Sequence, residues 1–174
     1  MKRLFILLVG FVLIGIVLAE WWVHSPYYGE VRMATTFITV DASADKVWQT
    51  LEATGDYSQW NPYIARVDGT LAAGARLRVV EKFGGKNHTY SVLVTRFQPS
   101  DRQFAWAGST WFPALLRWSE SFVVEPIDAT HCRVDISQGY QGVLLRSFWN
   151  NNNQKALSAV KQMGQALKKR AAQS

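Results

Sequence analysis

Two acidic residues are the first candidates for chemistry, because each lies on the apolar face of a predicted strand. Glu81 belongs to the alternating run at residues 76–83, and Glu120 belongs to the one at residues 115–124. The other members of these two faces are Leu77, Val79, Phe83, Trp118, Phe122 and Val124. A carboxylate in apolar surroundings is disfavoured unless it has a partner, and its pKa tends to rise. Glu81 and Glu120 are therefore candidates for anchoring a ligand hydroxyl or for general acid–base catalysis.

A purely structural explanation of both acids also stands. In one alternative the alternation is displaced by one residue, which would turn the carboxylates to solvent. Alternatively, an arginine could neutralise them inside the fold; the nearby candidates are Arg76, Arg78 and Arg96. Under either alternative the two acids would carry no chemistry.

Aromatic side chains accompany these acids in unusual number, with eight tryptophans in 174 residues. Trp and Tyr provide large apolar surfaces with one polar atom, which suits both protein cores and ligand cavities. We predict a ligand-binding set that combines the aromatic residues with the two acids: Trp60, Tyr63, Glu81, Trp106, Trp118, Glu120, Phe122 and Tyr140.

Other kinds of site find little support. His24, His88 and His131 are not spaced as metal ligands, and the single cysteine, Cys132, is predicted to be a small buried residue. Phosphate-binding, dinucleotide-binding and nucleophile-elbow motifs are absent from the sequence. The net charge of +6 is modest and no basic stretch is interleaved with aromatics. We predict no metal, no cofactor and no nucleic-acid partner.

The N-terminus predicts contact with a membrane. Lys2 and Arg3 precede sixteen uncharged residues, Leu4–Ala19, and Trp21 follows them. A helix of this length approaches the thickness of the hydrocarbon layer, and the two cations favour a cytoplasmic N-terminus. We predict a transmembrane anchor at residues 1–23, a linker at 24–30 and an extracytoplasmic domain at 31–174. The alternative is a signal peptide cleaved after Ala19, which would export the domain.

The remaining pattern predicts an α+β fold. A β-branched strand at residues 33–40 precedes a helix at 44–53, and about six further strands follow. The turn between two of them is predicted at Gly84-Gly85. Helical spacing of apolar residues then predicts a long C-terminal helix. The four residues Asn150–Asn153 favour a loop, a late helix start or a distorted first turn, because Asn is a poor helix former.

The run Ile38–Ile64 resembles the opening of the START-related helix-grip (SRPBCC) superfamily, in its polyketide cyclase/dehydrase branch. The matching residues include Val47-Trp48 and Trp60-Asn61-Pro62, and the resemblance extends from about Met33 to Arg170. It implies a curved antiparallel sheet of about seven strands around the long C-terminal helix. It also implies a cavity between them for a lipid, polyketide or isoprenoid-like molecule. The Asn150–Asn153 run departs from the usual start of that helix.

Three functions follow from these features. The favoured one is a membrane-anchored START-like domain that binds a hydrophobic small molecule between the sheet and the helix. The second is an enzyme of the cyclase/dehydratase type that uses Glu81 or Glu120 together with a tyrosine. The third is a protein-interaction domain of the cell envelope. Two carboxylates facing each other across a cavity would favour the enzyme, whereas a filled core would favour the interaction domain.

Overall fold

A computed structural model describes residues 10, 15 and 29–173, and it contains a sheet, a long helix and two short helices. The seven strands are β1 (Arg32–Val40), β2 (Ile64–Asp68), β3 (Arg76–Phe83), β4 (Lys86–Gln98), β5 (Gln103–Ser109), β6 (Arg117–Pro126) and β7 (Cys132–Gln141). The helices are α2 (Ala44–Glu52), α3 (Tyr57–Trp60) and α4 (Leu145–Gln173), with 3₁₀ turns η1 (Thr54–Asp56) and η2 (Pro99–Asp101).

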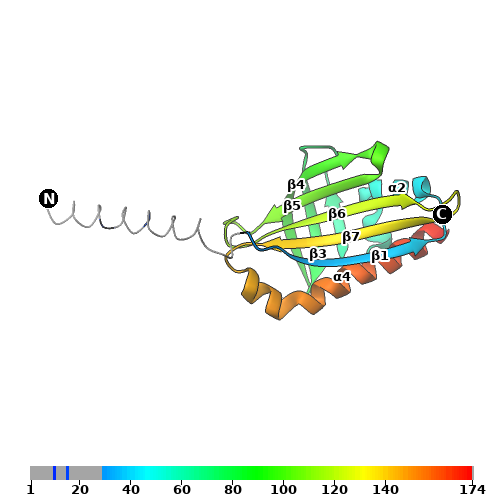
Figure 1. Cartoon of the computed structure of the whole chain (residues 1–174). Helices are drawn as coiled ribbons and strands as arrows, with labels where there is room; N and C mark the ends of the chain where they lie inside the picture. The colour runs from blue at the N-terminus through cyan, green and yellow to red at the C-terminus, as the bar shows by residue number, and fades with distance from the viewer. Residues whose placement is uncertain (1–9, 11–14, 16–28, 174) are drawn as a thin grey trace.

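All strand pairs are antiparallel, and their order is β1-β7-β6-β5-β4-β3-β2. Strands β2 to β7 are therefore a meander, and β1 joins it at the far edge by pairing with β7. Helices α2 and α3 connect the two edge strands, and α4 packs against β1 and β7 (Figure 1). This is the helix-grip arrangement, and the expected seven-stranded sheet with a long C-terminal helix is confirmed.

Local sequence explains how the strands and helices begin and end. The Ser43 hydroxyl accepts a hydrogen bond from the backbone N–H of Lys46 and caps α2. Gly84 and Gly85 adopt positive φ values of 61° and 79° in the turn between β3 and β4. Two such residues in sequence are typical of the tight hairpin turn, which only glycine and a few polar residues tolerate. The predicted hairpin at Gly84-Gly85 is thus present.

Helix α4 begins earlier than the sequence predicts, and the expected irregularity at Asn150–Asn153 is wrong. Leu145 is buried at the helix start, so tertiary packing holds the first turn in place. The side-chain amides of Asn151 and Asn152 donate to the carbonyls of Ser147 and Phe148, one turn earlier. Packing and these local bonds override the weak helix propensity of Asn.

The predicted transmembrane anchor at residues 1–23 and nearly all of the linker at 24–30 lie outside the described residues. Among the residues that the structure does describe, no helix has the length and apolar character needed to cross a membrane. The described domain begins at β1, whose first residue, Arg32, pairs with Tyr140 of β7.

Candidate functional site

A cavity of about 110 Å³ lies between the sheet and the first turns of α4. Its wall is largely aromatic and aliphatic, with a single acid; the lining residues are Tyr63, Glu81, Phe83, Tyr90, Thr110, Leu116, Trp118, Tyr140 and Phe148. Four of the predicted ligand-binding residues meet here: Tyr63, Glu81, Trp118 and Tyr140. They come from four different parts of the chain, which the antiparallel sheet brings to one side of α4.

Glu81 is the acid of the cavity, and only 3% of its surface is exposed. It lies on β3, where alternation turns it inward with Leu77 and Val79, as the sequence predicts. The Tyr63 hydroxyl donates to Glu81 Oε2 at 2.9 Å, whereas Oε1 has no hydrogen-bond partner among the described residues. Burial raises the pKa of Glu81 well above the usual carboxyl range, and the neighbouring charge of Glu120 raises it further. Both effects favour the protonated, neutral form of Glu81.

Asn61 holds Tyr63 in place. Its Oδ1 atom accepts hydrogen bonds from the backbone N–H groups of Tyr63 and Ile64, both at 2.9 Å. These bonds fix the corner between α3 and β2, from which the Tyr63 side chain reaches Glu81. Burial raises the pKa of Tyr63, so its hydroxyl stays protonated and remains a donor. The Trp60-Asn61-Pro62 element thus positions a cavity residue as well as ending a helix.

Glu120 lies behind the cavity wall rather than in it. Its side chain is fully buried on β6, where Trp106 Nε1 donates to Oε2 at 2.8 Å and Gln138 Nε2 donates to Oε1. The Tyr140 hydroxyl in turn donates to Gln138 Oε1 at 3.0 Å. Burial raises the pKa of Glu120, and the two donated bonds partly counteract that rise. The chain Glu120–Gln138–Tyr140 therefore links the core to the cavity through hydrogen bonds.

The side chains that donate hydrogen bonds to the two acids are all neutral, so the alternative of an arginine partner is wrong. Arg76, Arg78 and Arg96 all lie in exposed positions, and Arg96 donates to Gln103 instead. The alternative of a displaced strand alternation is also wrong, because Glu81 and Glu120 both face inward.

Trp118 provides a second open polar atom. Its indole N–H is buried and has no partner within residues 29–173. The ring packs edge-on against Tyr90, with centroids 4.6 Å apart, and covers Gly108 of β5. A Cβ at Gly108 would lie 2.8 Å from the indole Cζ2, so glycine is what allows the ring this close to the strand. Glu81 and Trp118 both line the cavity, and each has one buried polar atom without a hydrogen-bond partner in the described residues.

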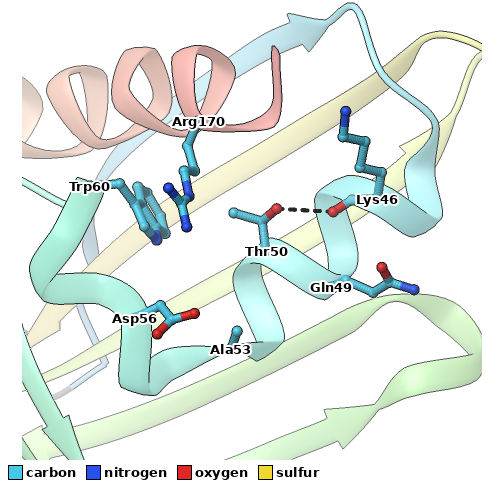
Figure 2. A pocket seen from close by; sticks show the side chains of 7 residues that line it. All are labelled: Lys46, Gln49, Thr50, Ala53, Asp56, Trp60 and Arg170. Atoms are coloured by element: carbon cyan, nitrogen blue, oxygen red, sulfur yellow. Dashed lines mark hydrogen bonds between the residues drawn. The ribbon is translucent and has the colours of Figure 1, made fainter. Parts of the chain in front are cut away.

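The other predicted site residues lie elsewhere. Trp106 and Phe122 are completely buried in the core, where they pack together with Phe104. Trp60 lines a separate groove of about 400 Å³ between α2, α3 and the end of α4 (Figure 2). That groove is polar, and its other lining residues are Lys46, Gln49, Thr50, Ala53, Asp56 and Arg170.

Some cavity residues escaped the sequence analysis. Tyr90 alternates with the buried Val92 and Val94 on β4, so the strand pattern could have identified it. Phe148 stayed hidden because the asparagine run placed the helix start after it. Thr110 and Leu116 lie in the loop between β5 and β6, where no periodic pattern indicates which way a side chain points.

A larger groove adjoins the cavity between the β3–β4 hairpin and the middle of α4. It measures about 430 Å³ and shares Tyr63 and Phe83 with the cavity. Its outer wall is polar, with Lys82, Gln154 and Lys155 among the lining residues. Tyr63 and Phe83 therefore lie between the apolar cavity and the polar groove. In the described part of the chain, no three His, Cys, Asp or Glu side chains gather as metal ligands would.

Comparison with known proteins agrees with this arrangement. Residues 32–172 match the sequence model of the family described as "Polyketide cyclase / dehydrase and lipid transport". No curated protein matches the chain. Norcoclaurine synthase from Thalictrum flavum, solved with dopamine and hydroxybenzaldehyde, superposes with a TM-score of 0.65 at 15% identity, over 83% of this chain and 88% of that one.

Two further structures extend the comparison. A START superfamily protein from Mycobacterium smegmatis has a TM-score of 0.61 at 17% identity, over 81% of this chain and 97% of its own. The di-domain ARO/CYC protein BexL, from the BE-7585A biosynthetic pathway, has a TM-score of 0.58 at 21% identity over 76% of this chain. The chain spans only 46% of BexL. Likeness at these identities establishes the fold, while function must be argued from the site.

Proposed function

The chain belongs to the polyketide cyclase/dehydrase and lipid transport family, and on that premise we propose that it binds a hydrophobic small molecule between the sheet and α4. The observation that carries the proposal is an apolar cavity whose lining residues Glu81 and Trp118 each have a buried polar atom without a partner in the described residues. Buried polar atoms normally have a hydrogen-bond partner. Two such atoms without a partner, on residues that line one cavity, are typical of a site where a ligand supplies the missing hydrogen bonds.

The chemistry of the two open atoms indicates what the ligand offers. The indole N–H of Trp118 can only donate a hydrogen bond. The neutral carboxyl group of Glu81 can also donate, since its pKa is raised. A lipid, polyketide or isoprenoid-like molecule with a carbonyl or hydroxyl oxygen would accept from both. Its apolar body would contact Phe83, Tyr90 and Phe148.

The size of the cavity bears on how such a molecule would sit. About 110 Å³ is less than the roughly 150 Å³ apolar cavity that accepts benzene, and well below an ordinary ligand pocket. A longer molecule would therefore pass between Tyr63 and Phe83 into the adjoining groove. We propose that the polar end of the ligand is held at Glu81 and Trp118, and that its remaining length lies in the groove.

The proposal includes the location of the protein. Residues 1–23 would anchor it in a membrane with a cytoplasmic N-terminus, and the domain would lie outside the cytoplasm. Support comes from the uncharged run Leu4–Ala19 behind Lys2 and Arg3. Export after cleavage at Ala19 is the alternative. Intact mass of the protein purified from membranes distinguishes the two, because cleavage removes the first 19 residues.

Native mass spectrometry of the detergent-extracted full chain tests the binding proposal. We expect a co-purifying apolar molecule in the wild type and its loss in Leu116→Trp, which fills the cavity. The matched control is Ala53→Phe, which puts an aromatic ring into the polar groove of Figure 2 and leaves the cavity untouched. Absence of any bound molecule across several expression hosts would contradict the proposal, as would equal loss in both variants.

A second candidate function is catalysis by Glu81 as a general acid. A carboxyl group with a raised pKa beside a tyrosine can protonate a carbonyl or hydroxyl oxygen of a bound molecule. The loss of water from a polyketide-like ligand is a reaction of that kind. Only one of the two acids lines the cavity, however, since Glu120 lies behind the wall with both oxygens bonded. Two carboxylates facing each other across the cavity, the arrangement that would favour the enzyme, are absent from the described structure, and binding is the better-supported function.

The ligand released from the wild type distinguishes the two functions. It would be returned to the purified wild type and to Glu81→Gln, and its mass followed over time. A loss of one water from the ligand with the wild type alone would establish the enzyme. If the mass of the ligand stays unchanged with both proteins, the domain acts as a carrier.

A further inference from the structure

Four exposed apolar side chains form one patch at an end of the domain. Trp111 is 92% exposed, Phe112 is 55% exposed, and Val143 and Leu144 are each 47% exposed. The first two lie in the loop between β5 and β6, and the others lie between β7 and α4. We call these four residues the apolar patch. Exposed tryptophan and phenylalanine side chains in adjacent loops indicate a surface that binds an apolar partner.

Backbone hydrogen bonds hold the two loops of the apolar patch together. The N–H of Val143 donates to the carbonyl of Ala114 at 3.0 Å, and that of Leu144 donates to Leu115 at 2.9 Å. Gly142 makes this approach possible, because a Cβ there would lie 2.5 Å from the Leu115 carbonyl oxygen. The two loops of the apolar patch are therefore held together as one surface.

The position of the apolar patch relates it to the N-terminal segment. Arg32, at the start of β1, pairs with Tyr140, directly before the loop that carries Val143 and Leu144. Val31 lies at the same end and is 51% exposed. Figure 1 shows β1 and α4 both beginning at this end, while α4 finishes at the opposite one. The chain thus enters the domain beside the patch.

Reach and charge both favour a lipid surface. Seven linker residues, 24–30, span at most about 25 Å even when extended. A membrane segment at 1–23 would therefore keep this end of the domain close to the bilayer. The two loops, 110–116 and 142–144, contain no charged residue. Arg117, the first residue of β6 after the first loop, is exposed, which suits the anionic headgroups of a phospholipid membrane.

The apolar patch also lies over the cavity. Thr110 and Leu116, which bound the β5–β6 loop, line the cavity, and so does Phe148, one helical turn after Leu144. We propose that the apolar patch inserts into the surface of a phospholipid bilayer, so that the cavity takes its ligand from the lipid phase. The inference rests on the proposed binding function and adds the surface through which the ligand enters.

Site-directed labelling of the full chain in phosphatidylcholine–phosphatidylglycerol vesicles tests this docking. Val143→Cys receives a fluorescent label, and Ile127→Cys is the matched control, 58% exposed in the β6–β7 turn at the opposite end of the sheet. The native Cys132 is buried, so labelling is directed to the introduced thiols. With nitroxide groups on the lipid acyl chains, we expect several-fold stronger quenching at position 143 than at position 127.

The double substitution Trp111→Ser and Phe112→Ser, added to Val143→Cys, should abolish that excess quenching. Neither residue lines the cavity, so this variant should still bind a linear primary alcohol added in solution. Failure to bind the alcohol there would count against the binding function instead. Equal quenching at positions 143 and 127, or quenching that survives the double substitution, would overturn the docking proposal. Shielding of the label that depends on protein concentration rather than on lipid would identify a second copy as the occupant and overturn it as well.

Discussion

Glu81 and Glu120 are both buried carboxyl groups, yet their surroundings suit them to different tasks. Both oxygens of Glu120 accept hydrogen bonds from neighbouring side chains, so this group completes the core. Within the described residues, Glu81 accepts from Tyr63 alone, and its second oxygen has no partner. The same residue type therefore has a structural role at position 120 and an available functional role at position 81.

The raised pKa of Glu81 makes stability depend on pH in a definite direction. A folded-state pKa above the unfolded value means that the folded protein binds the proton more tightly. The corresponding stability is fully present below the ordinary carboxyl range and is lost as the pH rises through the raised pKa. We expect Glu81→Gln to match the wild type near pH 5 and to exceed its free energy of unfolding by about 2 kcal/mol at pH 9.

Urea denaturation between pH 5 and pH 9 measures this difference. Glu125→Gln is the control, because Glu125 lies exposed on β6 and its replacement should leave the wild-type pH profile unchanged. A profile of Glu81→Gln parallel to that of the wild type would show that Glu81 does not titrate in this window.

The same amide substitution at position 120 should have the opposite effect. Even when protonated, the carboxyl group of Glu120 keeps acceptor capacity on both oxygens for Trp106 and Gln138, whereas glutamine offers one acceptor oxygen. One of these donors would then face an NH₂ group inside the core, which costs about 1–3 kcal/mol. We expect Glu120→Gln to lower the free energy of unfolding at pH 5, where Glu81→Gln does not. Equal stability of the two variants at pH 5 would contradict the assigned hydrogen bonds.

At the scale of secondary structure, α4 shows where sequence reasoning succeeded and where it failed. The apolar spacing after residue 156 predicted the helix, because those residues face the sheet along its whole length. Its first turns depend on Leu145 packing into the core and on Tyr140 meeting Phe148, with ring centroids 4.9 Å apart. Such contacts between distant parts of the chain leave no periodic signal in the sequence. The predicted helix start was therefore too late, because it was inferred from the asparagine run.

The packing of α4 on β1 depends on Gly164. A Cβ at this position would lie 3.2 Å from Ile38 Cγ2 and 3.6 Å from Thr36 Cγ2. Alanine can be accommodated by a small shift and gains helix propensity, so Gly164→Ala should change stability by less than about 1 kcal/mol. We expect Gly164→Leu to destabilise by more than about 2 kcal/mol, because the side chain forces the helix away from the strand.

Thermal unfolding followed by circular dichroism measures both substitutions. Gln165→Leu adds the same side chain to the exposed neighbouring position and should leave the midpoint nearly unchanged. A tolerated leucine at position 164 would show that the helix is not held as closely to β1 as the structure indicates.

At the scale of the whole molecule, alternation along strands predicted which residues face inward, and so it located Glu81, Glu120 and their aromatic neighbours. It could not separate core from cavity. Trp106, Trp118 and Phe122 follow the same pattern, yet of these three only Trp118 lines the cavity, which lies beside the first turns of α4. That distinction depends on the distance between two packed layers, which no single strand records.

The small cavity and the larger groove beside it predict how affinity changes with ligand length. Each methylene group buried in an apolar site contributes about 0.8 kcal/mol. In a series of linear primary alcohols, with the hydroxyl held at Glu81 and Trp118, affinity should rise steeply until the chain fills the cavity. It should rise more slowly once the chain enters the groove, whose wall includes Lys82 and Lys155. Displacement of a fluorescent probe from the full chain measures the series.

Leu116→Trp should move the change of slope to a shorter alcohol, because it takes volume from the cavity and leaves the groove intact. A single slope that Leu116→Trp does not alter would mean that the ligand binds outside the cavity.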